Sequence, residues 1–530
     1  MSFLRPTLPS YDPIAWSRLP FAERARLVCE AWAIQGYGSP VGAYFFYLLK
    51  AAFYVYMWRV FTGPVPWLSP IAFQKAILWS MLFEGLGLGC GSGPLTGRYV
   101  PPIGGLLYWL RPGTTKLPLV GGHKRTWLDV MLYAALIGCT VRALLAPALT
   151  LELIAPIVVL VPVIGLLDKT IFLALRAEHY WTTLVCFAFA GNWIAGAKSV
   201  QLALWFFAGV SKLNHHFPSV VGVMVSNSPL TRFAWMRRLV YKRYPTDLHP
   251  SLLAVCMGHS GTFLELTVPI VMLLAQPGPT LMVGMVMMLA LHAFITSNVP
   301  MGVPIEWNLM VVYGAFALFW AHPEVPAFAI TPWPLAAFLA LMLCVVPIAG
   351  NLWPARVSFL LAMRYYAGNW AYGVWLFKGD SHKKLERLTT SAPWVYDQLA
   401  RFYDRPTGVA LVGKVLGFRL MHLHGRALSE LLPKAVDRLQ DYEYLDGEIV
   451  AGLVLGWNFG DGHLHNESLL RSVQAQCGFA PGELRCIFVE SQPLGKDGMD
   501  YRIVDASTGE IGRGTLSVAK LRARQPWEAA

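Results

Sequence analysis

Lys212 is the residue with the clearest potential for chemistry in this chain. It stands near the end of the apolar stretch Gln201–Leu213 (QLALWFFAGVSKL), shortly after the small pair Ala208-Gly209. Small residues let a neighbouring helix or a ligand approach closely. A lysine partly removed from water there has its neutral form favoured, and a neutral amine is a base. The residues leave two interpretations open: Lys212 is a general base, or it only marks the end of a membrane span at the lipid headgroups. Residue chemistry alone favours the second.

Further ionisable residues fall in apolar segments, where the cost of placing them makes each a functional hypothesis. They are Lys50, Lys75, Glu84, Arg142, His179, His259, Glu265 and His292. We expect Lys50, Lys75 and Arg142 to reach the headgroups or to pair. Glu84 could neutralise Lys75 or Lys50 across the first two spans, with no role beyond packing. Glu265 is expected either to be a hydrogen-bonded neutral acid or to pair with a group such as Lys212 or His179.

Two His-x-His pairs near the C-terminal end are weak candidates for a metal site. They are His422/His424 and His463/His465, the second with Asp461 beside it. On a strand alternate residues share a face, so each pair could bind one metal ion. The pattern is short and common, and the glycines around Asp461 indicate a turn. We therefore expect no metal ion, with these residues as weak candidates.

The eight cysteines contain no CxxC pair, which removes the usual zinc and thioredoxin-type signals. Cys477 and Cys486 alone share a polar region. They could form a disulfide if that region were outside the cytoplasm.

The elements that must position these residues are membrane helices. Of the 530 residues 55% are hydrophobic and only 14% are charged, and the mean hydropathy is +0.47, whereas soluble proteins carry roughly 25% charge. The high hydrophobic content and the low charged content exclude a disordered chain and an ordinary soluble enzyme. The apolar segments are continuous runs, which favour helices over the alternating strands of a barrel.

The chain is therefore predicted to be an α-helical polytopic membrane protein of about ten spans, with a C-terminal soluble α+β domain. The spans are predicted at residues 41–61, 67–90, 128–148, 152–170, 180–196, 199–214, 251–275, 280–297, 306–321 and 332–349. Lysines and arginines gather in the N-terminal segment and after the second, sixth and tenth spans. This asymmetry predicts both termini in the cytoplasm. The net charge of +12 thus comes from loops, and it gives no support to nucleic-acid binding.

Three domains are predicted: a cytoplasmic or interfacial segment at 1–38, a transmembrane domain at 39–350 and the soluble domain at 351–530. Within the first, Phe21–Trp32 has the spacing of a short interfacial helix. In the last, Glu448–Phe459 and Leu484–Glu490 are predicted strands. Tyr501–Lys520 is a predicted hairpin that closes at Thr508-Gly509.

Three local motifs occur in the order found in one known family. They are Leu166–Thr170 (LLDKT) followed by His179-Tyr180, then FFAGVSKLNHHF around Lys212, then Leu291–Met301 (LHAFITSNVPM). Together they resemble the vitamin K-dependent γ-carboxylase superfamily, also called horizontally transferred transmembrane domain proteins. The chain looks most like an uncharacterised bacterial branch of that superfamily, which implies a place in the inner (cytoplasmic) membrane.

The resemblance implies an enzyme that acts on a lipid or an isoprenoid quinol, with a reduced isoprenoid quinone as the implied cofactor. Lys212 would be the general base, His179 would hydrogen-bond the reacting oxygen and His292 would position the substrate. The soluble domain does not resemble the large β-rich domain of the carboxylase, which speaks against carboxylation of protein glutamates. Membrane lipid or quinone is the expected partner. The alternatives are a non-catalytic lipid-binding or transport protein and a membrane-anchored scaffold.

Overall fold

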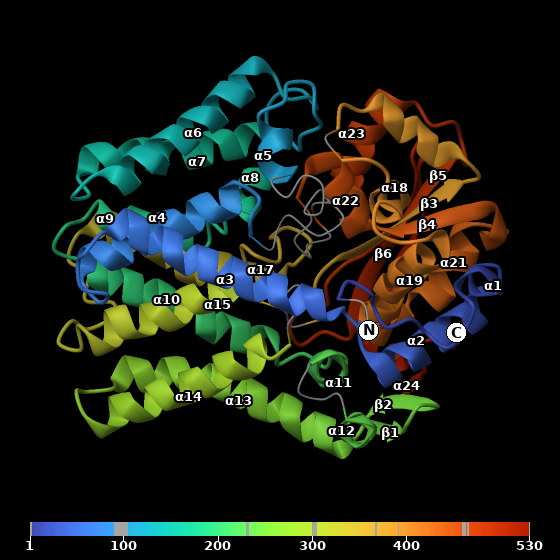
Figure 1. Cartoon of the computed structure of the whole chain (residues 1–530), viewed down its shortest axis with the longest axis horizontal. Coiled ribbons are helices and arrows are strands. Elements are labelled where there is room, and N and C mark those ends of the chain that lie inside the picture. The colour runs from blue at the N-terminus through green and yellow to red at the C-terminus, as the bar shows by residue number, and fades with distance from the viewer. Residues whose placement is uncertain are drawn as a thin grey trace.

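Apolar helices form one half of the molecule, and a sheet with its helices forms the other (Figure 1). The computed structural model describes residues 3–89, 104–228, 233–298, 305–365, 368–390, 392–457, 463 and 466–528. The chain is mostly helical, and its five-stranded sheet lies in the C-terminal third of the sequence. Both ends of the chain lie on the side of the bundle where the sheet is (Figure 1).

The bundle is built from apolar helices whose lengths vary widely. They are α3 (Val41–Thr62), α4 (Pro70–Gly85), α6 (Trp127–Leu145), α7 (Leu151–Leu167), α9 (Tyr180–Phe187), α10 (Trp193–Ser211), α11 (Phe217–Asn227), α13 (Leu252–Leu274), α14 (Pro279–Thr296), α15 (Ile305–Gly314) with the π-helix η3 (Ala315–Trp320), and α16 (Trp333–Ala340), which continues through η4 (Leu341–Val345) into α17 (Val346–Leu352). Short elements connect them: α5 (Gly104–Trp109), α8 (Thr170–Ala174), α12 (Ala234–Leu239) and the hairpin of β1 (Tyr241–Arg243) and β2 (Asp247–Pro250).

Five helical segments in the described residues are long and apolar enough to cross a membrane. They are Trp127–Leu145, Trp193–Ser211, Leu252–Leu274, Pro279–Thr296 and Trp333–Leu352. The protein is therefore membrane-embedded, but the structure does not confirm ten spans. In the most apolar window of α10, 83% of the residues are buried, against 33–39% in the other four. The helix that ends at Lys212 is thus the centre of the bundle.

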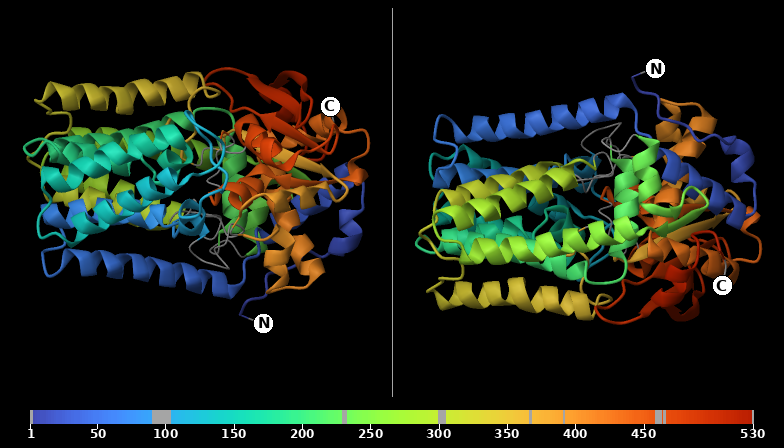
Figure 2. Two further views of the ribbon diagram at one scale, coloured as in Figure 1. Left: turned by 90° about the horizontal axis from the view of Figure 1, so that it is seen from above. Right: turned by 90° about the horizontal axis from the view of Figure 1, so that it is seen from below.

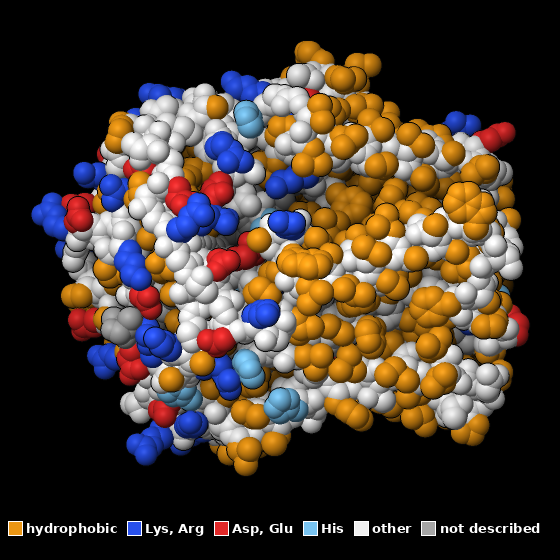
Figure 3. Space-filling model, turned by 180° about the vertical axis from the view of Figure 1, so that it is seen from behind, with side chains coloured by type: hydrophobic (Ala, Val, Ile, Leu, Met, Phe, Trp, Pro, Cys, Tyr) orange, Lys and Arg blue, Asp and Glu red, His pale blue; other side chains and the backbone are white. Residues whose placement is uncertain are grey.

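The outer helices present apolar side chains to the surroundings. Figure 3 shows a broad hydrophobic surface over the bundle, while charged side chains gather on the other half of the molecule. Helices α3 and α16–α17 flank the bundle on opposite sides (Figure 2). A surface of this kind is expected where lipid tails surround a protein.

The predicted boundaries differ from the structure around α9 and α10. A single span was expected at 180–196, yet α9 stops at Phe187 and α10 begins at Trp193, after a turn that includes Gly191 and Asn192. Asn192 accepts hydrogen bonds from Thr331 in that turn. Helix α11 was not predicted as a span, because eleven residues are too few to resemble one.

The C-terminal sheet is antiparallel throughout, in the order β4-β3-β5-β6-β7. Its strands are β3 (Tyr372–Lys378), β4 (Tyr442–Asp446), β5 (Leu484–Val489), β6 (Gly498–Asp505) and β7 (Gly509–Ser517). The predicted strand at Leu484–Glu490 and the predicted hairpin are confirmed, and Asp505 pairs with Gly509 where the hairpin closes. The α+β character of this region is therefore as expected.

The predicted strand at Glu448–Phe459 is wrong over its described part; Asn458 and Phe459 lie outside the described residues. Gly447–Leu455 forms the helix α22, in which the Asp446 side chain accepts a hydrogen bond from the Glu448 amide at the N-terminus. Gly456 ends the helix in a left-handed conformation, with φ of 78°. A short apolar run fits a buried helix as well as a strand, so the two caps decide the outcome.

Further helices cover the sheet: α18 (Val395–Ala400), α19 (Arg405–Met421), α20 (Leu423–Arg426), α21 (Leu428–Ala435), α23 (Glu467–Cys477) and α24 (Val518–Ala523), with the 3-10 turns η5 (Ser381–Arg387) and η6 (Leu439–Asp441). Helix α22 packs on β3 and α21 packs on β5. Cys477 and Cys486 are buried free thiols.

The N-terminal helices α1 (Pro13–Ser17) and α2 (Phe21–Gln35) pack against α19, as Figure 1 shows. The predicted helix at Phe21–Trp32 is confirmed as a helix, and its apolar side chains are buried against protein. A Cβ atom added to Gly413 would lie 2.8 Å from the Trp16 ring, and one added to Gly417 would lie 3.1 Å from Val28. Glycines four residues apart on α19 therefore let both N-terminal helices approach closely.

Lys414, between these glycines, ties the N-terminal segment to α19. Its amine donates hydrogen bonds to the carbonyl oxygens of Thr7 at 2.5 Å and Tyr37 at 2.8 Å. Burial lowers the pKa of Lys414 to about 7. An amine with that pKa is largely neutral at slightly alkaline pH and still has two N–H groups, which match these two acceptors.

Candidate functional site

Lys212 lies inside the bundle and forms an ion pair with Glu265 of α13. The two side chains are only 5% and 8% exposed. The Lys212 amine also donates to the carbonyl oxygens of Ala208 at 3.2 Å and Tyr365 at 3.3 Å. The amine thus faces protein groups and not the lipid headgroups. Of the partners suggested for Glu265 by the sequence, Lys212 is the one observed.

Gly209 is the residue that allows this contact. A Cβ atom at Gly209 would lie 2.9 Å from the Leu266 side chain and 3.1 Å from its backbone nitrogen. Helix α13 therefore packs directly on the backbone of α10, next to Glu265. The small pair before Lys212 serves helix approach, one of the two uses that its residue types suggested.

His292 is held on both ring nitrogens. Its Nε2 accepts a hydrogen bond from the Trp205 indole at 3.0 Å, and its Nδ1 lies 2.8 Å from Asn308 Oδ1. Because an indole N–H can only donate, Nε2 must be the acceptor and Nδ1 must carry the proton. His292 is thus neutral, with one fixed tautomer.

His179 precedes α9 and is 3% exposed. Its ring lies 4.7 Å from the Tyr180 ring and 6.3 Å from the Trp307 ring, both measured between centroids. Within the described part of the chain, neither His179 Nδ1 nor the Trp307 indole nitrogen has a hydrogen-bond partner. Buried polar atoms without partners are uncommon in native proteins, so these two are available to a bound molecule or to water.

Trp307 connects the three residues that the sequence singled out. Its ring stacks on Tyr365 at 4.7 Å and lies 6.3 Å from the rings of both His179 and His292. The carbonyl oxygen of Tyr365 accepts the hydrogen bond from Lys212. Lys212, His179 and His292 therefore surround one pair of aromatic side chains, although no contact joins them directly in the described structure.

Other buried charges accompany this cluster. Arg176 pairs with Glu84 at 2.6 Å, and Lys50 pairs with Glu306 at 3.0 Å. The predicted pairing of Glu84 with Lys75 or Lys50 is therefore wrong; the amine of Lys75 donates to the carbonyl oxygen of Phe61. Arg142 is exposed at the end of α6, which agrees with its expected reach to the surface. His259 is exposed on α13.

Sequence reasoning missed Arg176, Glu178, Glu306 and Tyr365. Glu178 accepts a hydrogen bond from the Tyr365 hydroxyl at 2.6 Å. The signal was present in Arg176-Ala-Glu178-His179, where three ionisable residues stand within four positions between apolar segments. Such a group is expected to be solvated in a loop, but here all three are buried.

A second polar cluster lies where the bundle meets the C-terminal region. His216, before α11, stacks on His424 of α20 with centroids 4.9 Å apart. Asn214 donates to the carbonyl oxygen of Gln492 at 3.2 Å. Burial lowers the pKa of His424 to about 4 and that of His422 to about 3, so both are neutral at pH 7.

The His-x-His pairs do not form the strand arrangement on which the metal hypothesis depended. His422 ends α19 and its Nδ1 donates to the carbonyl oxygen of Phe418, while His424 belongs to the helix α20. His463 lies 3.0 Å from Glu490. His465 and Asp461 lie outside the described residues. In the part of the chain that is described, no three His, Cys, Asp or Glu side chains are placed to hold a metal ion.

Comparison with known proteins places the chain in a family. It belongs to the family described as "Transmembrane protein of unknown function (DUF3556)", which matches residues 1–530. No curated protein and no solved structure matches the chain.

Proposed function

We propose that this transmembrane protein is an enzyme that acts on a lipid or an isoprenoid quinol within the membrane, with Lys212 as the general base. The observation that carries the proposal is the ion pair of Lys212 with Glu265, buried in the centre of the bundle. Buried charges are costly and are retained where they serve a purpose. Lys212 also donates to the carbonyl oxygen of Tyr365, whose ring stacks on Trp307. His179 and Trp307 each have a polar atom without a partner within the described residues.

The pair offers a route by which a lysine can act as a base. One proton can move from the Lys212 ammonium to the Glu265 carboxylate, which leaves a neutral amine and a neutral acid. Both charges disappear in that step, so a site removed from water favours it more than water does. The neutral amine can then take a proton from a quinol hydroxyl, and the resulting ammonium stabilises the phenolate that forms.

The two histidines have different roles in this proposal. His179 can donate or accept a hydrogen bond at the reacting oxygen, because its Nδ1 has no partner among the described residues. His292 has both nitrogens occupied by Trp205 and Asn308. It is therefore a positioning residue that fixes the packing around Trp307.

The resemblance to the γ-carboxylase superfamily supports a reduced isoprenoid quinone as the substrate or cofactor. With it we propose about ten membrane crossings, a place in the bacterial inner membrane and cytoplasmic termini, with the C-terminal region from residue 351 as a cytoplasmic domain. The asymmetry of basic residues between loops supports this orientation.

One observation favours a non-catalytic lipid-binding, transport or scaffold protein instead. Lys212 already has three partners without any ligand, namely Glu265 and the carbonyl oxygens of Ala208 and Tyr365. An ammonium group has three N–H donors, so its capacity is filled. A purely structural ion pair would have the same appearance.

Turnover in proteoliposomes separates these functions. The substrate is reduced menaquinone with a short isoprenoid tail, and dioxygen uptake is the readout. Lys212→Met is expected to abolish protein-dependent uptake. Lys198→Met is the matched control, because Lys198 is buried on the same helix and its amine donates to the carbonyl oxygens of His322 and Val325.

Full activity in Lys212→Met would refute the role as a base. If the wild-type protein shows no uptake while mass spectrometry detects a lipid co-purified in stoichiometric amount, the lipid-binding alternative is supported instead.

A further inference from the structure

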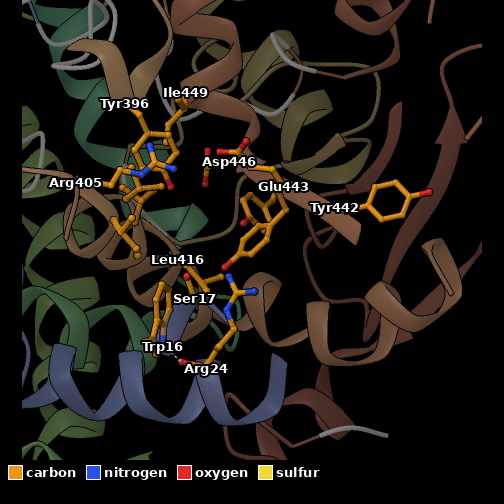
Figure 4. A pocket seen from close by; sticks show the side chains of 16 residues that line it. Trp16, Ser17, Arg24, Tyr396, Arg405, Leu416, Tyr442, Glu443, Asp446 and Ile449 are labelled. Carbon is orange, nitrogen blue, oxygen red and sulfur yellow. Dashed lines mark hydrogen bonds between the residues drawn. The ribbon is translucent and has the colours of Figure 1, made fainter. Parts of the chain in front are cut away.

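A cavity of about 200 Å³ lies between the N-terminal helices and the C-terminal domain (Figure 4). None of its lining residues belongs to the candidate site in the bundle. Its walls come from α1 and α2, from α18 and α19, and from β3 and β4 with the start of α22. At about 30 Å³ for each water molecule it has room for roughly seven waters, which is the size of one substituted ring.

Two arginines face this cavity from different walls, as Figure 4 shows. The Arg24 guanidinium lies 5.0 Å from the centre of the Trp16 ring and 5.1 Å from that of Tyr444. The Arg405 guanidinium lies 3.8 Å from the centre of the Tyr396 ring. A guanidinium that stacks on a ring by its face keeps the N–H groups on its edge available to an acceptor.

No salt bridge within 4.0 Å involves Arg24 or Arg405 in the described ranges of the chain, and the buried Nε of Arg24 has no hydrogen-bond partner there. Both side chains are nonetheless held in place by aromatic rings.

The cavity also contains two acidic side chains, Asp446 and Glu443. Asp446 pairs with Arg419 at 2.6 Å and accepts from the Glu448 amide at 2.8 Å. Glu443 lies 3.4 Å from His382. Burial raises the pKa of its carboxyl, while the charges of His382 and Arg405 lower it. Two arginines thus stand beside one carboxyl that has no arginine in an ion pair, so positive charge is in excess in the cavity.

We infer that this cavity binds a small organic anion, a carboxylate or phosphate carried on a planar ring. The anionic group fits the edges of Arg24 and Arg405, and the ring fits the aromatic faces of Tyr396 and Tyr444. Arginine and aromatic side chains are the usual means of holding such ligands. This inference does not depend on the function proposed for the bundle.

The position of the cavity implies a structural effect of binding. Its walls come from segments that are far apart in the sequence, around residues 16–24, 396–416 and 442–449. A ligand that contacts Arg24 and Arg405 together would fasten α2 to α19 and stabilise the contact between the N-terminal helices and the C-terminal domain.

Calorimetric titration of the full-length protein in nanodiscs tests the inference with four single-ring probes. Phenyl phosphate and benzoate carry the required charge, benzyl alcohol is neutral and benzylamine is cationic. We expect at least one of the two anions to bind, and the neutral and cationic probes not to bind. Arg24→Gln and Arg405→Gln should each weaken anion binding by roughly tenfold or more, since each removes a charge-assisted contact. Arg26→Gln is the matched control, because Arg26 is on α2 but outside the cavity and pairs with Glu30.

The native protein provides a second test that does not depend on the folding of variants. Phenylglyoxal modifies accessible arginines, and mass spectrometry locates the modified residues. The bound anion should protect Arg24 and Arg405 and leave Arg26 reactive. The inference is overturned if neither anion binds at millimolar concentration, if benzylamine binds as well as the anions, or if inorganic phosphate alone binds as tightly as phenyl phosphate.

Discussion

Removal of either member of the Lys212–Glu265 pair should destabilise the protein, with opposite dependence on pH. Lys212→Met leaves the Glu265 carboxylate buried without a cation. The carboxyl can escape this by taking up a proton, which for an ordinary glutamate of pKa about 4.3 costs about 3.7 kcal/mol at pH 7. The destabilisation should therefore approach this value, which lies within the roughly 3–5 kcal/mol found when a buried pair is broken.

The pH dependence follows from the same reasoning. The cost of protonating a carboxyl falls by about 1.36 kcal/mol per pH unit, so the defect of Lys212→Met should shrink to roughly 1 kcal/mol at pH 5. Glu265→Gln leaves an unpaired ammonium, and neutralising an ordinary lysine costs about 4.6 kcal/mol at pH 7 and about 1.9 kcal/mol at pH 9. That variant should thus recover as the pH rises.

The double variant Lys212→Met/Glu265→Gln should be more stable than either single variant. Its stability should show neither the recovery at low pH expected of Lys212→Met nor the recovery at high pH expected of Glu265→Gln. It leaves no buried charge, and well-packed neutral pairs often equal buried ion pairs in stability. Its recovery would isolate the interaction between the two residues, as a double-mutant cycle requires. If Lys212 is the base, this restored variant should remain inactive.

Reversible unfolding in SDS titrations of the purified protein, repeated at pH 5, 7 and 9, measures these free energies. Lys198→Met is the control, because it removes a buried lysine of α10 whose amine meets two carbonyl oxygens. Single variants that lose less than about 1 kcal/mol, or a double variant that equals the sum of the two losses, would refute the idea that the two charges depend on each other.

Three further predictions concern other parts of the molecule. Burial lowers the pKa of Lys414 to about 7, so between pH 7 and about 10.4 the unfolded chain binds more protons than the folded one. The free energy of unfolding should therefore rise with pH over that window. In Lys414→Met, measured by thermal unfolding, this contribution to the rise should be missing. A pH profile identical to that of the wild-type protein would contradict the prediction. His292→Leu should cost roughly 1–3 kcal/mol, because the Trp205 indole loses its acceptor and a buried donor is left behind. A shift in the SDS midpoint tests this, and a loss below about 1 kcal/mol would show that the bond is not needed. Cysteines placed at Gln276 and Lys383, both exposed, should react with an impermeant maleimide from opposite sides of the membrane; labelling of both from one side would show that the proposed orientation is wrong.

Several features of the fold follow from local sequence. The hairpin of β6 and β7 was predictable because the polar turn at Thr508-Gly509 lies between two runs in which apolar and polar residues alternate. The partner of Glu265 was partly predictable for a different reason: residues 251–350 contain no lysine or arginine, so its cation had to come from an earlier helix or from the chain beyond. Lys212 satisfied this condition and lay in a span.

The ion pair of Glu84 with Arg176 could not be predicted in the same way. The two residues are 92 positions apart, and several basic side chains lie at comparable separations. Only the packing of α4 against the segment before α9 selects Arg176. Likewise, α22 was predicted as a strand because a short apolar run has no periodicity that separates the two structures. Asp446, just before the run, and Gly456, inside it, cap the helix and decide the outcome.

The packing of α1 and α2 on α19 has a consequence for how the protein is made. Thr7 meets its partner Lys414 across 407 positions of sequence. At about 5–20 residues per second of synthesis, the ribosome needs roughly 20–80 seconds to cover that distance. During this time the apolar faces of the N-terminal helices have no α19 to cover them, while the membrane helices are being inserted. We therefore expect the nascent chain to depend on a chaperone or on the membrane surface until the last third has emerged.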